Sequence, residues 1–169
     1  MNRSALLIAI ATATLLAGCG KFQEAASEAA AEKAIEASTG KKVDINNEDG
    51  RQSVTIETDK GTYTASSGEN VALPPSFPKD VHLPADAKLM SAMSMGQALS
   101  VTLTSQQTLS ATYETYRKAQ TSDGWTETMA MQDATSGLLT MEKGQQTVLT
   151  HFVAENGATT MVVNVQPKP

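Results

Sequence analysis

Short runs of alternating apolar and polar residues, separated by glycine-containing turns, constrain the fold of this chain most. The runs 99–103 and 161–165 carry Leu, Val or Met at every second position. Because successive side chains of a strand point to opposite faces, this period is typical of strands that bury one face. The pair Asn156-Gly157 stands between two such runs and predicts a tight hairpin. The sequence therefore predicts an antiparallel sheet.

The region 87–169 combines these strands with one helix. In the segment 108–124, Leu109, Tyr113, Tyr116 and Gln120 recur at helical spacing, and Gly124 is the stop signal. One helix on a mostly antiparallel sheet buries the apolar faces of both, which predicts an α+β domain with the order β-β-α-β-β-β-β. The expected strands cover 87–95, 98–105, 125–131, 137–142, 147–155 and 158–166.

Two smaller units precede this domain. Residues 41–72 show three short alternating runs joined by turn residues, and they predict a three-stranded meander. Residues 73–86 contain four prolines, which disfavour regular structure and predict an extended connector between the meander and the main domain.

An Ala/Glu-rich segment, residues 19–40, predicts a tether helix over 22–38 that stops at Gly40. Its glutamates recur every four residues and form one row on a helix. Like charges at this spacing repel mildly, so we expect the row to face water. In an alternative interpretation, an alanine row pairs with another helix while the glutamates meet a cationic partner. The glutamates of the row are Glu24, Glu28, Glu32 and Glu36.

The first 18 residues have the layout of a signal peptide. A basic start at Arg3 precedes an uncharged apolar run, which is shorter than the ~20 residues that a membrane-spanning helix needs. The run ends in "LAGC", residues 16–19. This motif resembles the lipobox of bacterial lipoproteins. The resemblance implies cleavage between Gly18 and Cys19, a diacylglycerol on the Cys19 sulfur, and acylation of the new amino terminus. A thiolate suits that transfer as a nucleophile.

This resemblance implies a protein held in the lipid bilayer by the acyl chains of Cys19. Gly20 stands where an Asp would resemble an inner-membrane retention signal. We therefore expect the periplasmic face of the outer membrane rather than the inner membrane. The alternative is an ordinary signal peptide with an incidental cysteine.

Residues 30–169 show a second resemblance through short motifs. The connector "FPKDVHLP", residues 77–84, and the later "SDGW", residues 122–125, resemble a group of uncharacterised bacterial lipoproteins. In that group a connector of this kind precedes a small α+β domain. The resemblance supports the architecture and implies no activity.

Composition excludes several function classes. A net charge of −5 argues against a nucleic-acid partner, and a single cysteine permits neither an internal disulfide nor a multi-cysteine zinc site. His82 and His151 lack metal-ligand spacing, and no nucleophile elbow or phosphate loop is present. We expect no cofactor and no enzyme. The expected function is a non-catalytic interaction or envelope accessory module with an envelope protein partner.

The methionines raise an alternative, a soft-metal or small-ligand binding lipoprotein. Met90, Met93 and Met95 carry thioethers of the kind that bind Cu(I). Methionine is also a common filler of cores. The sequence favours core packing for these residues and for the similar pair Met129 and Met131.

Overall fold

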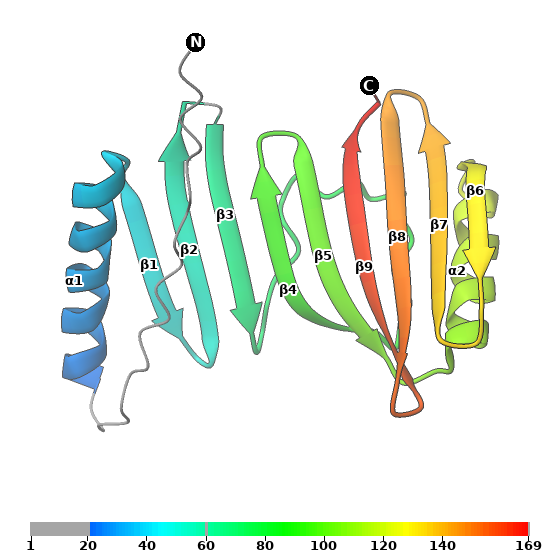
Figure 1. The fold of residues 1–169 in the computed structure, drawn as a ribbon, viewed down its shortest axis with the longest axis horizontal. Helices are drawn as coiled ribbons and strands as arrows, with labels where there is room; N and C mark the ends of the chain where they lie inside the picture. Colours follow the sequence, from blue (N-terminus) through cyan, green and yellow to red (C-terminus); the bar gives the residue numbers. More distant parts are fainter. Residues whose placement is uncertain (1–20, 60, 169) are drawn as a thin grey trace, which may run out of the picture.

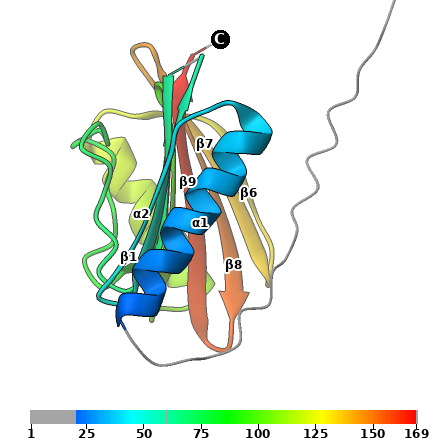
Figure 2. The same cartoon turned by 90° about the vertical axis from the view of Figure 1, so that its left-hand side faces the viewer.

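The computed structural model describes residues 21–59 and 61–168. Within them, nine strands form one antiparallel sheet in the order β1-β2-β3-β4-β5-β9-β8-β7-β6 (Figure 1). Helix α1 lies along the β1 edge, and helix α2 lies against one face of the sheet (Figure 2). The cleavage and lipidation predictions for Gly18 and Cys19 concern residues outside the described range. The elements are α1 (Lys21–Thr39), β1 (Val43–Glu48), β2 (Arg51–Thr58), β3 (Gly61–Gly68), β4 (Lys88–Met95), β5 (Ala98–Ser105), α2 (Leu109–Ser122), β6 (Thr126–Gln132), β7 (Ser136–Lys143), β8 (Gln146–Glu155) and β9 (Ala158–Pro167).

The α+β class is confirmed, but the arrangement of the strands differs from the prediction of a meander followed by a separate sheet. Strand β3 pairs with β4, from Tyr63 opposite Met95 to Ser67 opposite Ser91. The strands on both sides of the proline connector therefore belong to one continuous sheet. The prediction missed this pairing because the connector interrupts the chain between the two strands.

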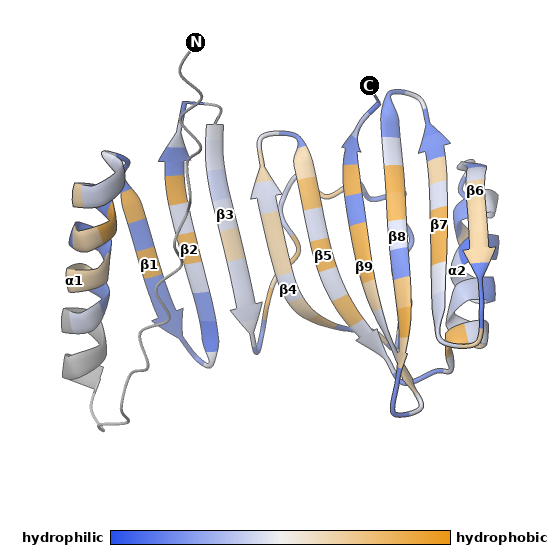
Figure 3. Ribbon diagram, viewed as in Figure 1, coloured by the Kyte–Doolittle hydropathy of each residue, from blue (hydrophilic) through white to orange (hydrophobic). Residues whose placement is uncertain are grey.

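The main core lies between α2 and strands β5, β9, β8 and β7. Alternate residues of these strands are buried and most of them are apolar. Figure 3 shows the alternation of hydropathy as bands along the strands. The Phe152 ring meets Tyr113 and Tyr116 edge-on, with ring centroids 5.1 and 5.5 Å apart. Burial raises the pKa of Tyr116 to about 12, and its hydroxyl accepts a hydrogen bond from Thr150 Oγ1 at 3.0 Å. Tyr116 is therefore a neutral core residue.

The connector is fastened to this core. Phe77 and Val81 are buried, and the Trp125 Nε1–H donates to the carbonyl oxygen of Asp80 at 2.7 Å. Lys143 Nζ lies 2.6 Å from the Asp80 carboxylate and 5.9 Å from the centroid of the Trp125 ring. The motifs "FPKDVHLP" and "SDGW" thus contact each other, and the buried Trp125 anchors the connector to the core.

The expectation that the glutamate row of α1 faces water is wrong for three of its members. Three of its carboxylates accept hydrogen bonds from backbone N–H groups of the edge strand β1. Four helical residues rise about 6 Å and two strand residues about 6.7 Å, so the two rows run nearly in step. The pairs are Glu28 with Asn47 at 3.0 Å, Glu32 with Ile45 at 2.8 Å, and Glu36 with Val43 at 3.0 Å. Helix α1 therefore covers one edge of the sheet.

Helix α1 ends where the sequence predicts. Gly40 has φ 66°, and its N–H donates to the carbonyl oxygen of Glu36 at 2.8 Å. A left-handed residue directly after the last turn is the common helix stop, and glycine adopts it without strain. This stop turns the chain back so that β1 runs antiparallel to α1.

Candidate interaction surface

The face of the sheet opposite α2 carries most of the exposed large apolar side chains of the described strands, and we call it the open face. In Figure 2, α2 and the connector lie on one side of the sheet, while the other side carries no helix over β4, β5, β9 and β8 in the described part of the chain. The strand register assigns Tyr63, Met93 and Met95 to the open face, opposite the buried Ala92 and Val101. Large apolar side chains therefore lie on both faces of one sheet.

A β-bulge in β4 turns two methionines to the open face. The register shifts between Leu89 and Ser91, so one extra residue enters the strand. Because strand side chains alternate, an extra residue moves every later side chain to the opposite face. Met93 and Met95 are accordingly 42% and 51% exposed. Met90, the extra residue, is exposed too, so the prediction that these three methionines fill the core is wrong.

A second bulge has the same effect in β6. The register shifts between Glu127 and Met129, after Trp125 has entered the core. Met129 and Met131 follow on the open face and are 48% and 62% exposed. The expected core packing of this pair is therefore also wrong. Methionines that the structure does bury are Met141 and Met161.

The methionines do not gather around one point. Strands β4 and β6 are separated by β5, β9, β8 and β7, so the pairs lie roughly 24 Å apart at the usual ~4.8 Å per strand. Met93 and Met95 are neighbours on one face, whereas Met90 sits in the bulge. Among the described residues, no group of three or more His, Cys, Asp or Glu could hold a metal ion.

The middle of the open face is uncharged. By register, the charged residues that β2, β3, β4, β5, β9, β8 and β7 place on this face stand only at strand ends within the described range: Lys88, Glu142 and Glu155. His151 is exposed in the middle and lies opposite Leu138 and Val162 rather than beside a carboxylate. The pairing around His151 therefore offers no acid–base partner.

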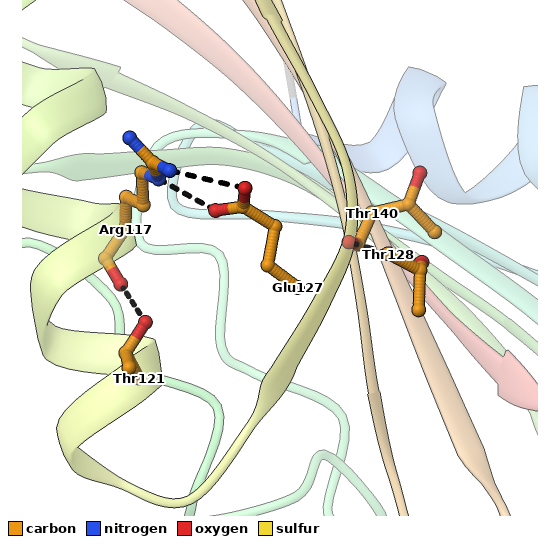
Figure 4. Close-up of polar contacts among 5 residues, drawn as sticks. All are labelled: Arg117, Thr121, Glu127, Thr128 and Thr140. Carbon is orange, nitrogen blue, oxygen red and sulfur yellow. Dashed lines mark hydrogen bonds and ion pairs between the residues drawn. The ribbon is translucent and has the colours of Figure 1, made fainter.

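A bidentate ion pair fixes the start of β6 against α2 (Figure 4). Arg117 Nε and one terminal guanidinium nitrogen lie 2.5 and 3.0 Å from the two Glu127 oxygens. This carboxylate raises the pKa of Arg117. The Thr128 hydroxyl donates to the Thr140 carbonyl at 3.2 Å. These contacts hold β6 in place next to the bulge, and none of them uses its outer backbone edge.

The remaining histidine lies in the connector. The His82 backbone N–H donates to the side-chain oxygen of Gln120 at 3.3 Å. His82 and His151 are thus on opposite sides of the sheet, because the connector packs with α2 and His151 faces the other way. The structure does not bring the two histidines together.

The sequence does not reveal the open face, because the alternation of polar and apolar residues does not show where a strand carries a bulge. Neither helix of the described residues is long and apolar enough to cross a membrane.

In the comparisons with known proteins, no protein-family model matches the chain, and no curated protein and no solved structure gives a significant match.

Proposed function

We propose that this chain is a lipoprotein held by the acylated Cys19 at the periplasmic face of the outer membrane, and that its sheet domain is a non-catalytic interaction or envelope accessory module. The anchor rests on the order of basic start, apolar run and "LAGC" in the first 19 residues. Three acyl chains would suffice for a stable anchor, since two lipid signals already hold a protein firmly in a bilayer.

The observation that carries the interaction role is the uncharged, methionine-bearing open face. The cores of protein–protein interfaces are depleted in charged residues and enriched in methionine and aromatic residues. The open face shares this composition at Tyr63, Met93 and Met95. A sheet that keeps one face in water usually carries polar residues there, so exposed methionines favour a partner on this face.

Two experiments test the two halves of the proposal. Intact-mass measurement of the membrane-extracted protein should give the mass of a chain that starts at a triacylated Cys19; a free thiol at full chain length would refute the anchor. For the interaction, a photo-crosslinking residue at Met93 should capture one reproducible envelope protein in cells. The same group at Lys118, on the outer side of α2, is the matched control. Equal capture at both positions, or none at Met93, would count against the open face.

Soft-metal binding is a second candidate because Met93 and Met95 are both exposed and share one face. Two thioethers at this spacing suit Cu(I) as soft ligands. Titration of the protein with Cu(I) should then show binding that the double substitution Met93→Leu and Met95→Leu abolishes. The double substitution Met129→Leu and Met131→Leu is the control. Binding that both double variants retain would remove this candidate.

A further inference from the structure

The two edges of the sheet differ in how their backbone groups are satisfied. On β1, glutamates of α1 accept the outward N–H groups of alternate residues. On β6, no side chain or loop among residues 21–59 and 61–168 hydrogen bonds to the outer backbone edge, and all of Thr126–Gln132 is exposed. Natural proteins usually protect a free edge with lysine, proline, a β-bulge or a covering element, and β6 has the bulge at Thr128 in its first half. Strand β6 contains neither lysine nor proline, and its one charge, Glu127, is paired with Arg117.

We propose that the outer edge of β6 binds an extended segment of another protein as an added strand, and that this segment carries positive charge and apolar side chains at alternate positions. The inference rests on the interaction role proposed above and names the partner chemistry. Main-chain hydrogen bonds supply affinity in this mode of recognition, while alternate side chains supply specificity. The bulge at Thr128 leaves Met129–Gln132 as the regular part of the edge.

Area and charge argue against a second copy of this chain as the occupant. A seven-residue strand is roughly 23 Å long, and a strip of that length and about 10 Å depth offers roughly 230 Å², far below the ~800 Å² per partner of stable complexes. Two copies would also repel each other, because the chain has a net charge of −5. An extended segment tethered to a larger partner does not need the area of a stable dimer.

The surroundings of β6 favour a cationic and partly apolar segment. Asp133 follows the strand directly and has no cationic partner among the described residues. Backbone N–H groups of Thr135 and Ser136 bond its carboxylate and lower its pKa to about 2, so it stays negative. On the open face, Met129 and Met131 present flexible thioethers that adapt to different side chains. A strand added to β6 would place its alternate side chains beside this pair.

The probe for this proposal is an eight-residue peptide of alternating Thr and Leu or Val with lysine at both ends. It is added to the membrane-extracted full protein in detergent, and amide hydrogen exchange is followed. We expect peptide at saturation to slow exchange of the outward-facing amides within Met129–Gln132 several-fold. A copy of the peptide with N-methyl groups on alternate amides should not do so. No slowing in β6, or equal slowing by the N-methylated peptide, would overturn the added-strand mode.

Two further arms test the partner chemistry and the position. A peptide with glutamate in place of the terminal lysines should bind several-fold more weakly; equal binding would overturn the positive charge of the segment. Met131→Lys puts a lysine on the edge strand, and we expect about fivefold to tenfold weaker binding of the lysine peptide from the lost cross-strand contact and the like charge. Gln132→Lys is a second substitution at the same edge, and Met95→Lys, in the middle of the sheet, is the matched control. Equal affinity of all three variants would overturn the site.

Photo-crosslinking in cells separates this inference from the proposed function. Capture of a partner through a basic, extended region from position 131 supports the edge site. Capture from position 93 alone keeps the interaction role and overturns the edge site. Capture from neither position overturns both.

Discussion

Removing the Glu32 carboxylate should loosen α1 from the sheet. Its Oε1 accepts the backbone N–H of Ile45 at 2.8 Å, in a partly buried position at the middle of the glutamate row. Glu32→Ala leaves this N–H without its acceptor, while the neighbouring bonds of Glu28 and Glu36 remain. The substitution therefore tests whether the row covers the edge or merely lies beside it.

The size of the effect follows from three opposing contributions. A hydrogen bond to a charged group contributes about 1.5 kcal/mol at the lower end of its range, which suits a half-exposed carboxylate. Alanine restores about 0.4 kcal/mol through its helix propensity, and loss of repulsion from Glu28 and Glu36 restores about 0.5 kcal/mol. The net expectation is a loss of about 0.6 kcal/mol in the free energy of unfolding.

The matched control is Glu114→Ala on α2. Glu114 is exposed and accepts no hydrogen bond within the described residues. The helix propensity of alanine restores about 0.4 kcal/mol, and the lost attraction to Arg117 and Lys118 on the same helix costs about as much, so this substitution should leave the stability about unchanged. Urea unfolding of both variants should therefore separate them by about 0.6 kcal/mol.

Amide exchange gives the local readout for the same prediction. The Ile45 amide should exchange faster in Glu32→Ala, while the Val54 amide on the next strand keeps its protection. The reasoning would be refuted if Glu32→Ala were as stable as Glu114→Ala, or if Ile45 exchanged at the same rate as in the unaltered protein.

Three further predictions follow from other contacts. Gly68→Ala should destabilise the protein by about 3 kcal/mol, because φ is +106° and a Cβ would lie 2.2 Å from a carbonyl oxygen of the neighbouring hairpin; a thermal melt that matches the unaltered protein would contradict this. Trp125→Phe should cost about 1–3 kcal/mol, because the Asp80 carbonyl loses its indole donor; urea unfolding measures the cost, and a neutral result would mean that water replaces the donor. Asp133→Asn should be less stable than the unaltered protein at pH 5, since the folded pKa of Asp133 lies near 2, below its ordinary 3.8. That advantage is present above pH 4 and disappears as the pH falls through about 2, so unfolding curves measured from pH 5 to pH 2 should converge; parallel curves would argue against the carboxylate.

Local features of the sequence predicted the elements well where short-range chemistry decides them. Helix α2 begins at Leu109, after Thr108, whose side chain accepts the N–H of Ala111, and it ends at Ser122, just before Asp123 and Gly124. Asn156 and Gly157 both have positive φ, as their hairpin signal predicts. These outcomes depend on a few neighbouring residues, so the sequence alone carries the information.

The functional surface depended on contacts that the sequence does not display. One added residue in β4 and one in β6 moved two methionine pairs from the expected core to the open face. A period-two pattern looks the same with or without such an insertion until the partner strand is known.

The sequence by itself determined the alternating strands, the two helices and the turns that join them. Only the tertiary structure decided that Glu32 accepts a hydrogen bond from β1, that Met131 is exposed, and that the β6 edge is open in the described residues. The physical reason is range. Propensities and turns act over a few residues. The carboxylate that accepts the N–H of Ile45 lies 13 residues away along the chain. Strand β9, which lies between β5 and β8 in the sheet, is the last strand in the sequence.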